Sequence, residues 1–303
     1  MTKIKLGMMN CFAVKRWPEP EAWCKIIRES LDLRYAQFSF DLLDPRALLH
    51  VRDKMCREIA EATQKYNIHL TSAFTGLAAY SCNLLLHPNL GMRMDALKWY
   101  EEAIKMGALM GADGTGGHLG ALSINDFNND KRKKYLMDFL LDVLQHLSRI
   151  AKNAGQKFLL WEPMPLRREP PCTIDEAKRL YDMVNEVAAV PIQFCLDLGH
   201  QCTVGVTGKD KDTYELLRQL ASYSPVIHIQ QTDGQGDRHW PFTEEYNSKG
   251  IIEPEKVIQS INDSGAEEVV LLFEIIHPFE ANEEKVLNDL KRSVEDWRKW
   301  VEE

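Results

Sequence analysis

Short apolar segments alternate with longer segments of helical periodicity along the 303-residue chain, and this alternation constrains its fold more than any other feature. In one helical segment Val51, Met55, Ile59 and Ala62 repeat at intervals of three or four, which places their side chains on one face. Strict alternation of strands and helices implies a parallel sheet, because neighbouring parallel strands need a crossover connection.

The chain contains eight such strand–helix units, the number that builds a (β/α)8 or TIM barrel. We therefore predict an α/β fold in which residues 1–303 form a single (β/α)8 barrel domain with eight parallel strands. A capping-box pattern at Thr173 and Glu176 supports a helix that begins there. The predicted strands cover residues 4–10, 35–40, 68–74, 114–119, 157–162, 192–198, 226–231 and 269–274, and the predicted helices cover residues 20–31, 45–66, 92–110, 130–153, 173–187, 212–223, 254–264 and 280–301.

An open, doubly wound sheet is the competing architecture. Such sheets normally carry a G-x-G-x-x-G fingerprint directly after the first strand. Here the first predicted strand ends at Met9 and Asn10 without a glycine cluster, and the Gly-rich segment 111–118 lacks this spacing and lies near the fourth strand. Both differences favour the barrel.

The composition excludes several classes of function. The formal net charge of −8 argues against a protein that mainly binds nucleic acid or an anionic membrane. No apolar run approaches the ~20 residues of a membrane span, and residues 1–12 do not resemble a secretory signal. The seven cysteines form no C-x-x-C pair, which fits a reducing compartment. We therefore expect a cytoplasmic protein with neither a nucleic-acid nor a membrane partner.

Each of the last four predicted strands carries a polar side chain near its carboxyl end. Glu162, Asp197 and Glu274 end the fifth, sixth and eighth strands, and His228 lies within the apolar seventh strand. Because a barrel's active site lies at the carboxyl ends of its strands, these side chains should meet at one rim. One of them alone could be a helix cap, a salt-bridge partner or a core histidine, but recurrence on four consecutive strands indicates a site.

Three carboxylates that are buried together need either protons or a cation, since unpaired buried charge is severely destabilising. A ligand set of three carboxylates and one imidazole suits one divalent ion, Mn²⁺, Co²⁺ or Mg²⁺, better than a structural zinc, which more often has thiolate ligands. Such an ion can polarise a carbonyl and hold an adjacent hydroxyl. The residues therefore favour a metal-dependent enzyme that acts on a hydroxy-ketone.

The second half of the chain also carries short motifs in a characteristic order, namely Trp161-Glu162-Pro163, Asp197-Leu-Gly-His200, His228-Ile-Gln, Arg238 and Phe273-Glu274. Their order and spacing resemble those of the xylose-isomerase-like TIM barrel superfamily. Within it they are most similar to the sugar epimerase branch, typified by D-tagatose 3-epimerase and D-psicose 3-epimerase. The resemblance covers the whole barrel topology, while motif agreement is confined to the second half.

The resemblance implies that Glu162, Asp197, His228 and Glu274 bind one divalent metal ion. It also implies that Glu162 and Glu274 are catalytic and flank the reacting carbon, one removing a proton and the other returning it through an enediolate that the metal stabilises. In the same family His200 and Arg238 would bind substrate oxygens. Family habit further suggests a homodimer or homotetramer.

Basic loops beside these motifs go beyond the sugar epimerase pattern. Arg167 and Arg168 follow the fifth strand, and His239 follows Arg238 after the seventh. Arg side chains suit phosphate, so we expect an anionic substrate, namely a short sugar phosphate. The segments are similar to enzymes of erythritol catabolism that epimerise or isomerise erythrulose phosphate. His118, which ends the Gly-rich fourth strand, is a further candidate for substrate binding.

Other activities use the same scaffold. A dehydratase of the inosose type would need the same metal but would expel a hydroxyl group. A phosphodiesterase of the AP-endonuclease type would need two or three metals, more histidine ligands and a basic surface, and a non-catalytic barrel would not need a carboxylate pair. A hydride shift typically uses two metals and a lysine, and no lysine ends any of these four strands. Proton transfer by an isomerase or epimerase of a ketose is therefore the preferred hypothesis.

Overall fold

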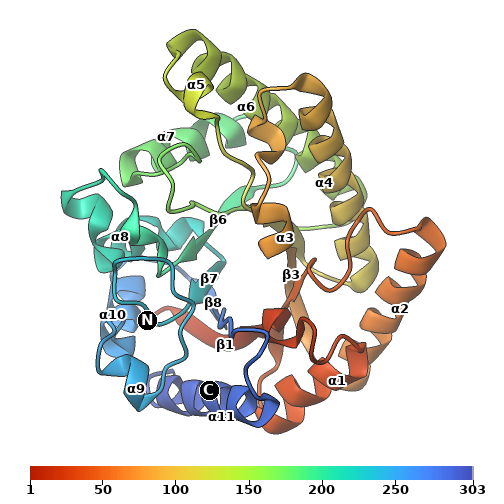
Figure 1. Ribbon diagram of the computed structural model, residues 1–303, viewed down its shortest axis with the longest axis vertical. Helices are drawn as coiled ribbons and strands as arrows, with labels where there is room; N and C mark the ends of the chain where they lie inside the picture. The colour runs from red at the N-terminus through yellow and green to blue at the C-terminus, as the bar shows by residue number, and fades with distance from the viewer. Residues whose placement is uncertain (302–303) are drawn as a thin grey trace.

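Eight parallel strands form a closed barrel in which each strand pairs with its neighbours in sequence order and β1 pairs with β8. The computed structural model describes residues 1–301. Figure 1 shows the strands at the centre and the longer helices as an outer ring. The predicted (β/α)8 fold is confirmed. The strands are β1 (Lys3–Met9), β2 (Tyr35–Ser39), β3 (His69–Phe74), β4 (Gly114–Gly117), β5 (Phe158–Trp161), β6 (Ile192–Asp197), β7 (Val226–Ile229) and β8 (Glu268–Phe273).

A helix lies in each predicted helical segment. These helices are α1 (Pro20–Lys25, continued by the π-helical turn η2, Ile26–Ser30), α2 (Leu49–Lys65), α4 (Leu90–Met110), α6 (Asp130–Asn153), α7 (Ile174–Asn185), α8 (Thr213–Leu220), α10 (Pro254–Asp263) and α11 (Glu283–Arg298). The sequence did not predict three helices in the connections, because four residues are too few to show a helical period: α3 (Leu77–Tyr80), α5 (Ile124–Phe127) and α9 (Glu244–Asn247).

The start of α7 follows the predicted cap with one difference. The side chain of Thr173 accepts a hydrogen bond from the backbone N–H of Glu176 at 3.2 Å, as the motif predicts. The Glu176 carboxylate, however, accepts from the N–H of Cys172 rather than from that of the cap residue. Thr173 thus satisfies one orphan donor of the helix, and Glu176 satisfies a donor just before the cap residue.

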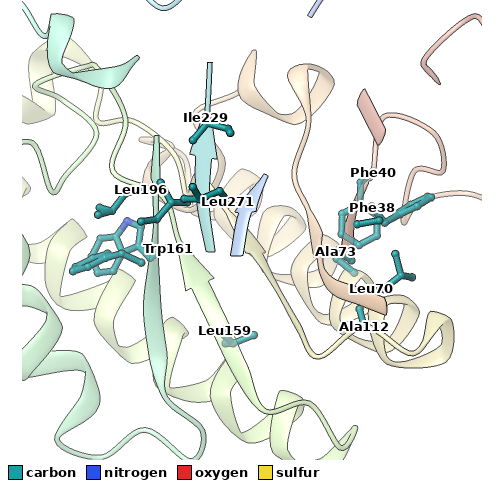
Figure 2. Packing of buried hydrophobic residues seen from close by; sticks show 14 of the residues in the cluster. Phe38, Phe40, Leu70, Ala73, Ala112, Leu159, Trp161, Leu196, Ile229 and Leu271 are labelled. Carbon is teal, nitrogen blue, oxygen red and sulfur yellow. The ribbon is translucent and has the colours of Figure 1, made fainter. Parts of the chain in front are cut away.

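Alternation along each strand divides the apolar side chains into two layers. Leu159, Trp161, Leu196, Ile229 and Leu271 belong to the main core between the sheet and the helices, part of which Figure 2 shows. Residues of the opposite parity fill the interior of the barrel, where Met9, Phe74, Leu160, Cys195, Val226, Val270 and Leu272 form a separate cluster. A residue two positions beyond one of these inward-facing side chains therefore also faces the barrel interior.

The Gly-rich fourth strand has a packing role. A Cβ atom at Gly116 would lie 2.0 Å from the backbone oxygen of Leu160 on β5, and one at Gly117 would lie 1.8 Å from the side-chain oxygen of Thr75. Strands β3 and β5 thus approach β4 too closely for larger residues. This close approach gives the glycine cluster a packing role in the barrel wall.

Helix α11 closes the ring of helices beside the first unit. Trp297 is fully buried, and its ring lies 5.1 Å from that of Phe242 and 6.2 Å from that of Phe273, measured between centroids. The guanidinium of Arg298 donates to the backbone oxygens of Leu31 and Asp32, which lie just after η2. The last helix thus contacts the first strand–helix unit of the barrel. Among residues 1–301, no helix is both long and apolar enough to cross a membrane.

We expect Trp297→Ala to lower the free energy of unfolding by about 3–5 kcal/mol, the usual cost of a large buried cavity. Trp300 is 43% exposed, so Trp300→Ala serves as the matched control. It should change the free energy of unfolding by less than about 1 kcal/mol. Urea denaturation followed by circular dichroism measures both values. Equal effects of the two substitutions would contradict the packing described for α11.

Candidate metal centre and active site

The four polar residues predicted at the ends of β5 to β8 all face the interior of the barrel. Glu162 comes two positions after the inward-facing Leu160, and Glu274 comes two positions after Leu272. Asp197 and His228 pair directly across β6 and β7 in the sheet register. The period of two along each strand therefore brings all four side chains to one rim of the barrel.

These four residues form one tight cluster. Each of Glu162, Asp197, His228 and Glu274 offers a ligand-type atom within 4.8 Å of those of the others. The Nδ1 atom of His228 lies 2.9 Å from Glu274 Oε2, 3.3 Å from Glu162 Oε1 and 3.9 Å from Asp197 Oδ2. Glu162, Asp197 and His228 are buried. The three carboxylates surround one nitrogen atom of the imidazole.

Two of the residues are anchored through one atom and leave the other without a partner. Asp197 Oδ1 accepts hydrogen bonds from Gly199 N at 2.6 Å and from the Gln230 side chain at 2.9 Å, and His228 Nε2 bonds to Gln37 Oε1 at 2.6 Å. Within the described part of the chain, Asp197 Oδ2 and His228 Nδ1 have no hydrogen-bond partner although both are buried. An anchored side chain with a free atom aimed at a carboxylate cluster is typical of a metal ligand. The residues present therefore fit one divalent cation.

The pKa values of the cluster show how strongly it requires positive charge. Burial, against the opposing charge of His200, raises the pKa of Asp197 to about 7. Burial also acts to raise the pKa of Glu274, but the neighbouring His228 outweighs it and the pKa falls to about 2. Burial lowers the pKa of His228, yet the surrounding groups, Glu274 among them, raise it well above its usual value. The raised pKa favours a proton on the imidazole, which a metal would displace because a ligating imidazole must be neutral.

A second polar group adjoins the cluster and contains His200 and His239. His200 Nε2 lies 3.5 Å from Asp237 Oδ2, and His239 Nε2 lies 3.0 Å from the same atom. Each Nδ1 faces a backbone oxygen, that of Pro163 for His200 and that of Glu274 for His239. Burial lowers the pKa of His239, but Glu274 and Asp237 raise it to about 9. Two predicted substrate residues thus lie beside the cluster, held by a carboxylate.

His118 and Arg238, two further predicted substrate residues, form hydrogen bonds with side chains outside the cluster. His118 is buried, its Nδ1 lies 2.9 Å from the Thr75 hydroxyl oxygen, and burial lowers its pKa to about 4, so it is neutral. Arg238 donates two hydrogen bonds of 3.0 Å to Asp233 and stacks over Trp240.

The two arginines after β5 point to neighbouring loops. Arg168 donates to the backbone oxygen of Leu122 at 2.7 Å. Arg167 lies near Gly205 and lines a surface depression together with Lys133 and Arg179 at the start of α7. The structure thus shows structural contacts for Arg168 and Arg238, and it places Arg167 in a depression lined by two further cations and by the carboxylates of Asp175 and Glu176.

Sequence reasoning missed four residues near the site. Gln37 contacts His228, and Gln230 contacts Asp197; both glutamines lie in predicted strands. Gln230 comes two positions after His228, so the strand period of two could have identified Gln230 as facing the site. Asp237 and Glu169 lie in loops, and nothing in the local sequence indicates that they approach the site. Their positions depend on how the loops fold.

The chain is similar to several known proteins. The family profile described as "Xylose isomerase-like TIM barrel" matches residues 29–297. The chain is 26% identical over 286 residues to D-erythrulose 1-phosphate 3-epimerase of Brucella abortus (strain 2308), covering 94% of this chain and 92% of that protein. It is 33% identical to a protein of Rhodospirillum rubrum ATCC 11170 provisionally named xylose isomerase, with a TM-score of 0.92 and coverage of 98% and 99%. D-psicose 3-epimerase of Clostridium cellulolyticum H10, solved with D-tagatose, shares the fold at 15% identity, a TM-score of 0.72 and coverage of 98% and 99%.

Glu169 gives a pH-dependent prediction for the metal-free protein. Its carboxylate is 3% exposed and accepts from Gly120 N at 3.1 Å, and burial raises its pKa from 4.5 to about 7. Between these two values the folded state holds a proton that the unfolded state has lost, so this residue makes stability fall as pH rises, with no further change above about pH 7.

Glu169→Gln retains the hydrogen-bond acceptor and removes the charge. We expect it to raise the free energy of unfolding near pH 8 and to change it little near pH 4. Urea denaturation in EDTA across this range measures the difference between variant and wild type. A variant less stable than wild type near pH 8 would show that the carboxylate is stabilising when it is ionised.

Proposed function

The chain belongs to the xylose isomerase-like TIM barrel family, and we propose on that premise that it is a metal-dependent epimerase of a ketose. The observation that carries the proposal is the cluster of Glu162, Asp197, His228 and Glu274, in which two buried atoms suited to ligate a metal have no hydrogen-bond partner among the described residues. A carboxylate pair next to a cation site is suited to proton transfer beside a carbonyl group.

The names of similar proteins support a sugar substrate. The Brucella abortus relative is named for the epimerisation of D-erythrulose 1-phosphate at carbon 3, and the match spans nearly all of both chains. The structures that share the fold include D-psicose 3-epimerase and L-ribulose 3-epimerase. We infer that this protein acts on a short ketose phosphate such as a tetrulose phosphate, as an isomerase in the broad sense that includes epimerases.

The metal would be held by the three carboxylates and by Nδ1 of His228. Oxygen-rich sites with one imidazole suit Mn²⁺, Co²⁺ and Mg²⁺. A cation in this cluster would supply positive charge beside a substrate oxygen on which negative charge develops. His228 and Asp197 hold their positions through hydrogen bonds from their other atoms, so the site is organised before any ligand binds.

Glu162 and Glu274 would exchange the proton with the carbon next to the carbonyl. They extend from β5 and β8, which are separated along the barrel wall by β6 and β7, so they reach the cluster from different sides. Removal of a proton by one carboxylate and its return by the other inverts the configuration at that carbon.

His200 and His239 would bind substrate oxygens, because their imidazoles lie beside the cluster on Asp237. His118 lies at the carboxyl end of β4 and offers a neutral imidazole. Arg238, Arg167 and Arg168 remain predicted phosphate ligands. For Arg238 this role requires that substrate phosphate displace Asp233 from its guanidinium.

The proposed reaction predicts exchange with solvent. When the metal-loaded protein is incubated in D₂O with a panel of ketoses and ketose phosphates, NMR should show deuterium at the inverted carbon of one short ketose phosphate. Retention of the original hydrogen would indicate hydride transfer, and loss of water from the substrate would indicate a dehydratase. Either result would replace the proposed function.

Glu162→Gln and Glu274→Gln should each lower kcat by at least about a thousandfold, or ~4 kcal/mol of transition-state stabilisation. Circular dichroism should show that the fold survives, because these side chains serve the site rather than the core. Glu268→Gln is the matched control, since Glu268 begins the same strand as Glu274 and pairs with Lys3 and Lys5 at the opposite end of the barrel. It should retain nearly full activity. An activity within about tenfold of wild type for either site variant would contradict its role.

A further inference from the structure

An amide side chain is buried in the apolar interior of the barrel, next to the cluster of Glu162, Asp197, His228 and Glu274. Gln37 on β2 is completely inaccessible to solvent, as is Ser72 on β3. The interior around them is otherwise lined largely by apolar side chains such as Met9, Phe74 and Leu272. An amide in such a place is destabilising unless its hydrogen bonds are made. Its contacts therefore indicate what it does there.

Gln37 belongs to a chain of hydrogen bonds that starts at His228 in this cluster. His228 Nε2 lies 2.6 Å from Gln37 Oε1, and Gln37 Nε2 donates to the Ser72 hydroxyl at 2.8 Å. The Ser72 and Thr71 hydroxyls are 3.5 Å apart, and Thr71 donates to the backbone oxygen of Ala36 at 3.0 Å. The chain thus connects β7, β2 and β3 and ends on a carbonyl group.

That carbonyl and the amide of Gln37 give the chain its direction. The oxygen of Ala36 can only accept, so the single hydroxyl proton of Thr71 points to it, and Thr71 must accept from Ser72. The Ser72 oxygen accepts from the amide of Gln37 at 2.8 Å, which agrees with this direction. The amide NH₂ therefore faces Ser72, and Oε1 faces His228. Because this oxygen can only accept, His228 must carry a proton on Nε2.

We propose that Gln37 is a positioning residue that fixes the tautomer and orientation of His228 so that Nδ1 presents its lone pair to the metal. The inference rests on the proposed metal-dependent function and deepens it. A neutral imidazole with a proton on Nε2 has its lone pair on Nδ1, the atom that the three carboxylates surround. The edge-on ring of Phe74, with its centroid 4.9 Å from that of His228, restricts the same imidazole from another side.

The test compares Gln37→Met with Gln37→Glu and with a control. Met has a similar length but accepts hydrogen bonds only weakly, whereas a protonated Glu can both accept from His228 and donate to Ser72. Gln156→Met is the matched control, because Gln156 is also a buried glutamine that donates to a strand hydroxyl, that of Thr115 at 2.7 Å, but has no contact with His228. Titration of metal-stripped protein with Mn²⁺, read by electron paramagnetic resonance, gives the affinity. Thermal unfolding in EDTA gives the stability of each metal-free variant.

Gln37→Met should weaken Mn²⁺ binding by about 10–100-fold, the usual effect of losing a hydrogen-bond partner of a ligating histidine. Gln37→Glu should restore most of that affinity, and Gln156→Met should bind Mn²⁺ like wild type even if its thermal stability falls. If Gln37→Met does not fold, Ser72→Ala should still weaken binding by a smaller factor, because the amide loses the group that orients it.

Three results would overturn the inference: unchanged affinity in Gln37→Met, or in Ser72→Ala if that variant takes its place; equal weakening in Gln156→Met; and no recovery in Gln37→Glu. None of these three results contradicts the proposed metal site as long as the wild-type protein binds Mn²⁺ in the same titration. If wild type itself binds no Mn²⁺, the metal-dependent function and the role of Gln37 both fail.

Discussion

Three carboxylates held around one imidazole nitrogen are the constraint on which the rest of this structure depends. Glu162, Asp197 and Glu274 repel one another when they are ionised, and burial removes the water that would screen them. A proton on the imidazole or on a carboxylate, or a metal ion bound among them, offsets this repulsion. A barrel rim that concentrates negative charge in this way is organised for a ligand rather than for its own stability.

The surrounding wall explains how such a cluster keeps its shape. Gln230 holds one oxygen of Asp197, and Gln37 holds one nitrogen of His228, so each of these two side chains keeps a single atom without a hydrogen bond in the cluster. Gln230 also donates to Asp237 at 2.6 Å, which links the cluster to the loop that carries His239. The cluster and the loop after β7 are therefore connected through one buried amide, the kind of outer contact that orients the ligands of a metal site.

Much of the fold and the core of the site could be predicted because both follow from short-range patterns. The eight strand–helix units are visible as changes of periodicity, and all eight predicted strands and all eight predicted long helices are present. The inward orientation of Glu162, Asp197, His228 and Glu274 follows from the strand period of two. Helices as short as α3 could not be predicted, because four residues do not complete a recognisable period.

Partners between distant segments could not be read from the chain. Gln37 and His228 are 191 positions apart, and only closure of the barrel, which pairs β1 with β8, places β2 across from β7. The conformation of the loop after β7 decides that Arg238 binds Asp233 while its neighbours Asp237 and His239 turn toward the cluster. The amino-acid sequence by itself determined which residues reach the rim, because side-chain direction along a strand is a local property. Only the tertiary structure decided which atoms they bind there, because a hydrogen bond depends on distances between segments that the fold brings together.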